Sequence, residues 1–285
     1  MVWMLVIASA GACAEELVVW SSSAQEWVSL DRLIAQLAPT RYILVGEVHD
    51  NELHHQRQLA LLERLQLRGR RVLALEIFDR DDQGWLASKP SLEEIGERVS
   101  ARGWDWGLYR ALVNSALDWG WPLQAANLSR SDAMRVARGE VALPAEVAAR
   151  LGDAGRQALL QDLVDSHCGH LNHATASSVL RAQQARDAAM AAVLQEAWQR
   201  WQLPVVLIAG NAHVRRDYGV PVYLDAASVV TVAMTEQSSA ERTGEQGREV
   251  WDFIWPATQQ QREDPCAAFA SRSAAPNERA TTAAR

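Results

Sequence analysis

Residues 44–55 read LVGEVHDNELHH and contain the signals of a strand, a turn and a helix in direct succession. Residues 42–45 form an apolar run of the kind that makes a buried strand. Asp50 and Asn51 can accept hydrogen bonds from the first free amides of a helix, so we predict a helix over residues 51–68. A strand followed at once by a helix is the unit of sheets with flanking helices.

The rest of the chain repeats this alternation of short apolar runs and longer helical patterns. Further strands are predicted at 72–77, 122–126, 204–209, 221–224, 229–234 and 250–254. Further helices are predicted near 27–37, 108–119, 129–138, 144–165 and 175–201. We therefore expect an α/β fold in which helices flank a central, mostly parallel sheet. Residues 27–256 contain no linker or repeat and should form one domain, with a smaller helical insertion or cap over residues 79–170.

The beginning of the chain has the composition of a targeting segment. Residues 1–14 include an uncharged apolar run that ends in small residues, as in a secretory signal. The run is too short to span a membrane. Two processing routes stay open: Ala12 and Ala14 fit ordinary cleavage, and residues 10–13 resemble a degenerate lipobox that would lipidate Cys13. We favour the lipobox over ordinary cleavage and over an unprocessed cytosolic N-terminus.

The end of the chain has a different composition. Residues 257–285 are rich in Ala, Ser, Thr, Gln and Arg and lack apolar periodicity, so we predict a disordered tail. An oxidising compartment would allow Cys168 and Cys266 to pair. Because Cys266 lies in this tail, we do not expect the bridge.

The overall composition argues against nucleic acid as a partner and is compatible with a ligand that binds in an apolar cleft. The formal net charge of −7, the pI near 5.5 and the absence of a Lys/Arg run argue against nucleic acid as a partner. The chain has 12 Trp and only 3 Phe. Tryptophan suits wide apolar pockets that need one hydrogen-bond donor, so a Trp-lined cleft fits this balance.

Polar side chains follow four of the predicted strands. In chain order they are Gly46, Glu47, His49 and Asp50; Glu76, Phe78 and Asp79; Asn127, Ser129 and Arg130; and Gly210, Asn211, His213 and Arg215. Ligands of open α/β sheets bind beyond the carboxyl ends of the strands. We therefore predict that the imidazoles and carboxylates of this set meet in one hollow.

Two further groups of side chains could serve an anionic ligand at this edge. His54 and His55 open the helix after the first strand and should point inward beside its positive dipole end. Arg186 shares an otherwise apolar helical stripe with Gln183. A buried arginine needs a carboxylate, which could come from Glu47 or Glu76 or from a ligand.

Two other segments contain groups that bind metals. Residues 165–173, DSHCGHLNH, combine one cysteine with three histidines, but the spacing matches no zinc pattern, and we predict a loop between helices. Tyr218 lies close in sequence to Arg215 and Arg216. It could be an ordinary turn aromatic, or positive charge could favour its phenolate, which is a ligand for ferric iron.

Together these motifs resemble those of the ChaN-like haem-binding lipoproteins. The resemblance covers roughly residues 27–232 and is carried by GEVHDNELHH, LEIF, WDWGLY, RAQQARDAAMA and GNAHVRRDYGVP. It implies a homodimer of α/β subunits with a small helical part, enclosing two stacked haems that tyrosines ligate, with histidines near the propionates. Carried over, the haem-binding residues would be His49, His54, His55, Arg186, His213, Arg215 and Tyr218. The iron ligand would be Tyr218 or His213, with Tyr109 as the alternative tyrosine.

The same resemblance implies a place and a role in the cell. It predicts a haem carrier for iron uptake or storage in the cell envelope, either an outer-membrane lipoprotein or a periplasmic protein. An outer-membrane haem receptor would be its further partner, and its contact with the membrane would be only a lipid anchor on Cys13.

The motifs also resemble a wider superfamily that contains erythromycin esterases and TIKI-type metalloproteases. This resemblance implies an alternative function as a metal-dependent hydrolase of esters or peptides, in which Glu47, His49, Glu76 and His213 hold a divalent ion or activate water. A third interpretation is a buried polar network that only stabilises the sheet edge.

Overall fold

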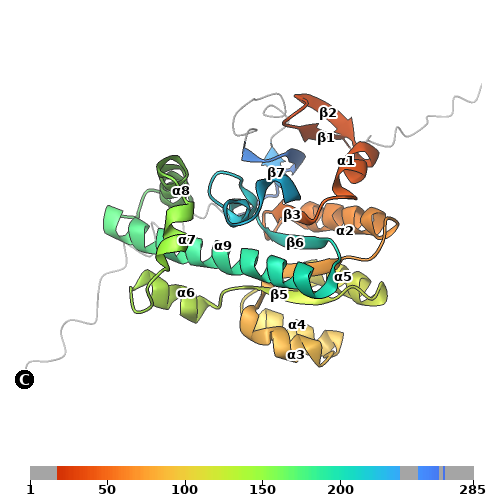
Figure 1. The fold of residues 1–285 in the computed structure, drawn as a ribbon, viewed down its shortest axis with the longest axis horizontal. Helices are drawn as coiled ribbons and strands as arrows, with labels where there is room; N and C mark the ends of the chain where they lie inside the picture. Colours follow the sequence, from red (N-terminus) through yellow and green to blue (C-terminus); the bar gives the residue numbers. More distant parts are fainter. Residues whose placement is uncertain (1–17, 238–249, 263–265, 267–285) are drawn as a thin grey trace, which may run out of the picture.

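The structure, a computed structural model, describes residues 18–237, 250–262 and 266. The predicted signal segment, residues 1–14, and residues 263–265 and 267–285 of the predicted tail lie outside the described residues. One eight-stranded sheet has the order β2-β1-β8-β7-β3-β6-β4-β5 (Figure 1). Its strands are β1 (Val18–Ser21), β2 (Glu26–Ser29), β3 (Tyr42–Glu47), β4 (Val72–Asp79), β5 (Leu123–Asn127), β6 (Val205–Gly210), β7 (Val229–Gln237) and β8 (Phe253–Thr258).

Helices connect and cover these strands. The α-helices are α1 (Leu30–Leu37), α2 (Glu52–Gln66), α3 (Gln83–Ala87), α4 (Leu92–Ala101), α5 (Trp106–Asp118), α6 (Arg130–Ala137), α7 (Ala145–Arg150), α8 (Asp153–Ser166) and α9 (His173–Trp201). Short 3-10 helices are η1 (Arg80–Asp82), η2 (Asn211–Val214), η3 (Val220–Tyr223) and η4 (Ala226–Ser228). β5 divides the predicted helical insertion into two groups, α3 to α5 and α6 to α8.

The sheet is parallel except at one end. β3 pairs in parallel with β6 and β7, β4 pairs in parallel with β6 and β5, and β8 pairs in parallel with β7. β1 is antiparallel to both β2 and β8. Every residue of β3 and β6 is buried, which explains their continuous apolar sequences. The prediction of a mostly parallel α/β sheet is therefore confirmed.

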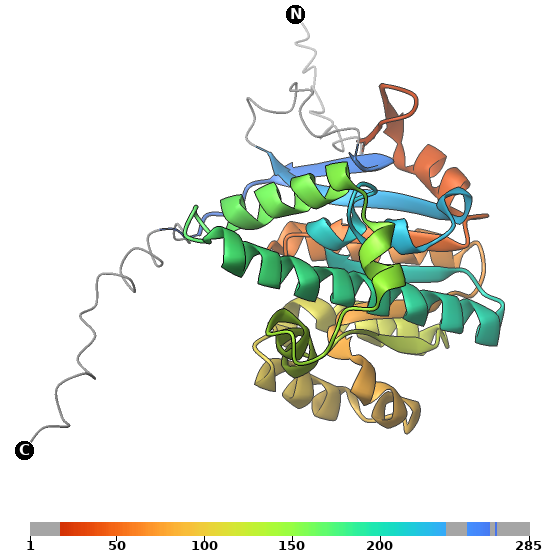
Figure 2. The ribbon, with the colours of Figure 1, turned by 60° about the vertical axis from the view of Figure 1, so that its left-hand side comes forward.

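Alternate side chains of the central strand enter two different cores. Ile43 and Val45 pack with Leu61 and Leu62 of α2 on one face, whereas Leu44 packs on the other face with Leu194 of α9. This alternation follows from the two-residue period of a strand. Figures 1 and 2 show α9 lying across one side of the sheet, with α2 on the other. Both faces are thereby covered, and the carboxyl ends of the central strands are left for polar groups.

Several predicted boundaries were wrong. Residues 221–224 do not form a strand, because η3 occupies residues 220–223 and Pro221 has no amide hydrogen for a ladder bond. The predicted helix over 144–165 is broken between α7 and α8 at Gly152. The β1–β2 hairpin was missed altogether, and it replaces the first part of the predicted helix at 27–37.

The prediction that Cys266 remains unpaired was also wrong. Cys168, in the α8–α9 loop, forms a disulfide with Cys266 and so ties the end of the chain to that loop. The bridge also removes Cys168 as a candidate metal thiolate among the nearby histidines. Within the part of the chain that the structure describes, no helix is both long and apolar enough to cross a membrane.

Candidate functional site

The polar groups that follow separate strands do meet at the carboxyl edge of the sheet. β3, β6 and β4 are adjacent, so the ends of these strands bring Glu47, Glu76 and the η2 turn together. His49 Nε2 lies 3.9 Å from Glu76 Oε2, and His213 Nε2 lies 3.3 Å from Glu76 Oε1. The prediction that His49, Glu76 and His213 share one location is confirmed.

These groups form a continuous row, which we call the polar row. It consists of alternating carboxylates and imidazoles with a tyrosine at one end. Its members are Tyr109, Glu47, His49, Glu76, His213 and Asp187. Tyr109, from α5, begins it by donating its hydroxyl to Glu47. Asp187, from α9, ends it with Oδ1 at 2.5 Å from His213 Nδ1. The row thus links helices on both faces of the sheet across the strand ends.

Glu47 is the most heavily bonded member of the row. Its Oε1 accepts from His49 Nδ1 at 2.8 Å and from the Tyr109 hydroxyl, and its Oε2 accepts from Gln58 Nε2 at 2.7 Å. Burial favours the neutral acid, but the hydrogen bond from His49 and the other bonds outweigh burial, so the pKa of Glu47 lies below its usual value. Glu47 is therefore a buried carboxylate that holds its neighbours in place.

The other end of the row is a buried ion triad. Burial alone would raise the pKa of Glu76, but the charge of His213 and the hydrogen bond with it lower that pKa to about 2. Burial alone would lower the pKa of His213, but the charges of Glu76 and Asp187 raise it to about 10. Burial raises the pKa of Asp187 to about 6 against the charge of His213. At neutral pH His213 is consequently an imidazolium between carboxylates, and its nitrogens carry protons instead of free lone pairs.

His49 is the most exposed member of the row. Its side chain is 44% exposed, against 8% for His213 and 1% for Glu47. Nδ1 is held by Glu47, while Nε2 makes no hydrogen bond to any described residue. The Trp104 ring stands edge-on to the imidazole, with centroids 4.8 Å apart. Although burial lowers its pKa, the hydrogen bond with Glu47 and the charge of Glu76 raise it overall. His49 therefore combines a nearly half-exposed ring, an Nδ1 held by Glu47 and an Nε2 that lies 3.9 Å from Glu76.

His54 and His55 point inward as predicted, but they serve the turn that carries His49. His54 Nδ1 accepts from the amide of Val48 at 2.9 Å, and His55 Nε2 donates to the carbonyl of His49 at 2.9 Å. Only 0% and 4% of their surfaces are exposed. Burial lowers the pKa of His54 to about 4, so it is neutral at physiological pH. The expectation of two imidazoles open to an anionic ligand is wrong.

Arg186 has a different partner from the internal acids that we considered. Its Nη1 donates to Asn127 Oδ1 at 2.7 Å. Among the described residues, Arg186 forms no ion pair with Glu47, Glu76 or any other carboxylate within 4.0 Å. The first alternative, an internal ion pair, is wrong. The second alternative, a carboxylate supplied by a ligand, stays a prediction for this half-buried guanidinium beside the polar row.

Tyr218 and Arg215 belong to a separate cluster. The Tyr218 ring is fully buried among α8 and α9 leucines, and its hydroxyl donates to Asp162 at 2.9 Å. Burial and the charge of Asp162 raise its pKa, although Arg215 stands 4.4 Å from the ring centroid. Arg215 itself is paired with Asp217 at 2.7 Å. The expectation of an easily ionised phenolate is wrong, because desolvation outweighs the nearby positive charge.

Sequence reasoning missed Asp187, Gln58 and Trp104 and ranked Tyr109 only second. A signal for Asp187 was available, because Gln183 and Asp187 are four residues apart on α9 and so share a face. Both contact His213 Nδ1, at 3.1 and 2.5 Å. No comparable spacing pointed to Tyr109, which reaches Glu47 from a helix 62 residues away in sequence.

The residues of the hydrolase alternative lie together, but their polar contacts are made to one another and to neighbouring side chains. His213 lies between Glu76 and Asp187, and Glu47 accepts hydrogen bonds from His49, Gln58 and Tyr109. No group of three or more His, Cys, Asp or Glu residues arranged to hold a metal occurs in residues 18–237, 250–262 and 266. The geometry therefore does not favour a metal-dependent hydrolase.

Comparisons with known proteins agree with the fold. Residues 33–224 match the model of a family described as haem-binding uptake, Tiki superfamily, ChaN. A structure of ChaN from Campylobacter jejuni, described as showing cofacial haem binding, is similar with a TM-score of 0.70 at 22% identity, covering 85% of this chain and 96% of that one. The type III effector HopBA1 has a TM-score of 0.51 at 10% identity, covering 81% and 94%. No curated protein matches the sequence.

Proposed function

The chain belongs to the ChaN family of haem-binding uptake proteins in the Tiki superfamily, and from this premise we propose that it binds haem at the carboxyl edge of its sheet. The observation that supports this location is the state of His49. Its side chain is 44% exposed and its Nε2, 3.9 Å from Glu76, makes no hydrogen bond to a described residue, while Glu47 holds Nδ1 at 2.8 Å. Carboxylate support of the second nitrogen is the usual arrangement behind a metal-ligating histidine.

The residues at this edge suit haem in three respects. Haem would supply an iron that takes a nitrogen or oxygen donor from the protein, and histidine is a frequent choice. His49 would supply that donor, and the Trp104 ring beside it offers an apolar surface for the macrocycle. Arg186, without an ion pair among the described residues, would meet a propionate.

The same geometry leads us to propose His49 instead of Tyr218 or His213 as the iron ligand. The hydroxyl of Tyr218 is buried and bonded to Asp162, and His213 is a protonated imidazole between two acids. Tyr109 is 1% exposed and donates to Glu47, so it is equally enclosed. In this assignment Glu47 fixes the tautomer of His49, and Tyr109 and Gln58 hold Glu47.

The proposal includes a homodimer. Cofacial binding, as described for the Campylobacter jejuni protein, places two haem rings face to face, and two copies of one chain would give each ring a protein partner. A place in the cell envelope, an anchor on Cys13 and transfer from an outer-membrane haem receptor remain part of the proposal from sequence.

Titration of the full chain with hemin tests the function. We expect a saturable shift of the Soret band, and light scattering with and without hemin should show a dimer when hemin is bound. Arg186→Gln should weaken binding, whereas Arg181→Gln, on the same helix but bonded to the carbonyl of Ala137, should not. The absence of saturable binding at micromolar hemin would contradict the proposed function.

A further inference from the structure

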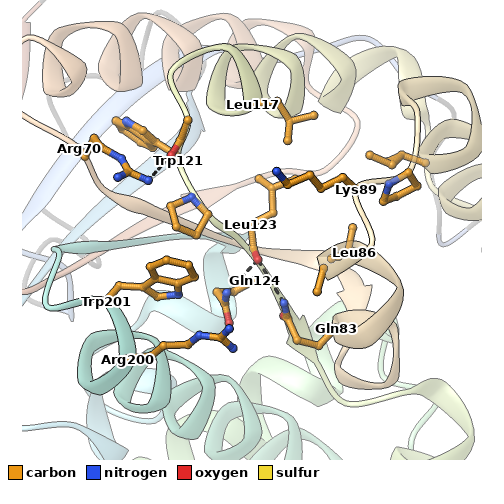
Figure 3. A pocket seen from close by; sticks show the side chains of 15 residues that line it. Arg70, Gln83, Leu86, Lys89, Leu117, Trp121, Leu123, Gln124, Arg200 and Trp201 are labelled. Atoms are coloured by element: carbon orange, nitrogen blue, oxygen red, sulfur yellow. Dashed lines mark hydrogen bonds between the residues drawn. The ribbon is translucent and has the colours of Figure 1, made fainter.

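A cavity lies at the opposite end of the sheet from the polar row. It has a volume of about 550 Å³ and opens at the start of β5, between α3 and the end of α9 (Figure 3). Arg200, which lines it, follows Arg186 on the same helix by fourteen residues, which corresponds to about 21 Å along the axis. None of the residues of the polar row lines this cavity. The two sites are therefore separate.

The cavity is lined by three cations and no acid. Arg70, Lys89 and Arg200 approach it from different sides, and Figure 3 shows the side chain of Lys89 extending across the opening toward Leu123. Arg70 donates one hydrogen bond, to the carbonyl of Gly120 at 2.5 Å. Among the described residues none of the three has a carboxylate within 4.0 Å. Such a grouping in a chain of net charge −7 favours a negatively charged ligand.

The rest of the lining is aromatic and aliphatic. Trp201 is 37% exposed and Leu117 is 41% exposed, so both are among the large apolar side chains that the fold leaves in solvent. Trp121 is buried at the wall, where its Nε1 donates to Gln66 at 2.5 Å. The guanidinium of Arg200 stands 5.1 Å from the Trp201 ring centroid, which places a cation beside an exposed aromatic face. Exposed apolar surface next to unpaired cations is typical of a ligand site.

We propose that this cavity binds a planar aromatic carboxylate. The ring would stack on Trp201, and the carboxylate would meet Lys89 and Arg200, which offer charge-assisted hydrogen bonds. The volume suits a ligand of two or more fused rings. A free aromatic acid and the carboxylate-bearing edge of a porphyrin share this chemistry. The cavity has no histidine, tyrosine, cysteine or methionine in its lining, so recognition here is independent of iron.

Calorimetric titration of the full chain with 2-naphthoate tests the site. Trp201→Ala and the double variant Lys89→Gln/Arg200→Gln should each weaken binding at least tenfold. Arg68→Gln, an exposed cation outside the cavity, is the matched control and should leave binding unchanged. The uncharged 2-naphthamide should bind at least tenfold more weakly than the acid. All the altered side chains are exposed, so unfolding midpoints should stay within a few degrees of the parent.

A competition experiment distinguishes the two kinds of ligand, a free aromatic acid and the carboxylate-bearing edge of a porphyrin. Iron-free protoporphyrin that displaces naphthoate from the cavity would support a porphyrin edge, and failure to displace it would support a free aromatic acid. Naphthoate that does not bind, or that binds equally to all variants or equally well as the amide, would overturn the proposal. Hemin titration of Trp201→Ala separates this result from the haem proposal, because the part of the Soret shift that depends on His49 should be the same in this variant as in the parent.

Discussion

Glu47 Oε1 accepts a hydrogen bond from His49 Nδ1 at 2.8 Å, at the carboxyl end of β3. The bond joins a buried carboxylate to a half-exposed imidazole, and it leaves Nε2 as the nitrogen of His49 without a hydrogen bond to a described residue. Tyr109 and Gln58 donate hydrogen bonds to Glu47, and Glu76 lies 3.9 Å from His49 Nε2. A change in either residue should therefore affect both the stability of the sheet edge and the proposed binding of haem.

Tyr109→Phe should lower the free energy of unfolding by about 2 kcal/mol, because it removes a donor from a fully buried carboxylate. Denaturant unfolding measures this change. Tyr218→Phe is the matched control: it removes a donor from Asp162, which is half-buried and can be solvated, so the loss should be smaller. Equal losses of unfolding free energy in the two variants would contradict a larger contribution from the hydrogen bond that Tyr109 donates to Glu47.

Two glycine substitutions should separate an effect on folding stability from an effect on the geometry around His49. An added Cβ at Gly46 would lie 2.3 Å from Asn211 Oδ1 and 2.6 Å from Val214 Cγ2, so Gly46→Ala should lower the unfolding free energy by about 3 kcal/mol. At Gly210 the new Cβ would lie 3.0 Å from His49 Nε2, on a ring that can move. Gly210→Ala should therefore weaken hemin binding about tenfold with little loss of stability.

Hemin titration and thermal unfolding of both variants measure these effects. A stable Gly210→Ala protein that binds hemin as tightly as the parent would contradict the placement of the ligand beside His49.

Much of this edge could be predicted from the sequence. The apolar run of β3 and the polar turn after it indicated a parallel strand end, and the polar residues that follow the other apolar strands implied that Glu47, Glu76 and His213 would meet. The contribution of Tyr109 could not be predicted, because it depends on how α5 packs against α2, which no local period encodes. Of the two alternatives for Tyr218, the easily ionised phenolate has the wrong sign, because sequence shows neighbouring charges but not desolvation.

Stability should fall on the alkaline side because of His213. Its pKa is about 10 in the folded chain, above the ordinary value of about 6.5. A raised pKa means that the stabilisation is complete below about pH 6.5 and is lost as the pH rises toward 10. Asp187, whose pKa is about 6, has finished titrating by pH 7.5, so the range from pH 7.5 to 9.5 isolates His213.

Urea unfolding at several values in that range measures the effect. His213→Gln should be less stable than the parent at pH 7.5 and should lose the downward slope. A parent protein whose unfolding free energy is constant from pH 7.5 to 9.5 would contradict the buried imidazolium.

The disulfide between Cys168 and Cys266 should stabilise the chain by about 2–4 kcal/mol, because it closes a long loop in the unfolded state. Cys266→Ser should therefore lower the thermal unfolding midpoint under oxidising conditions. With reductant present, the parent and the variant should unfold at the same temperature. A midpoint of the parent that is insensitive to reductant would show that the bridge contributes nothing.

The central claim is that His49 presents the iron-binding nitrogen, and hemin titration of His49→Ala tests it most directly. The affinity should fall at least tenfold and the Soret band should move, because the variant lacks the imidazole that would donate to the iron. His170→Ala, which removes an exposed imidazole from the α8–α9 loop, and Tyr218→Phe should leave both readings unchanged. An unaltered affinity and band position in His49→Ala would contradict the assignment.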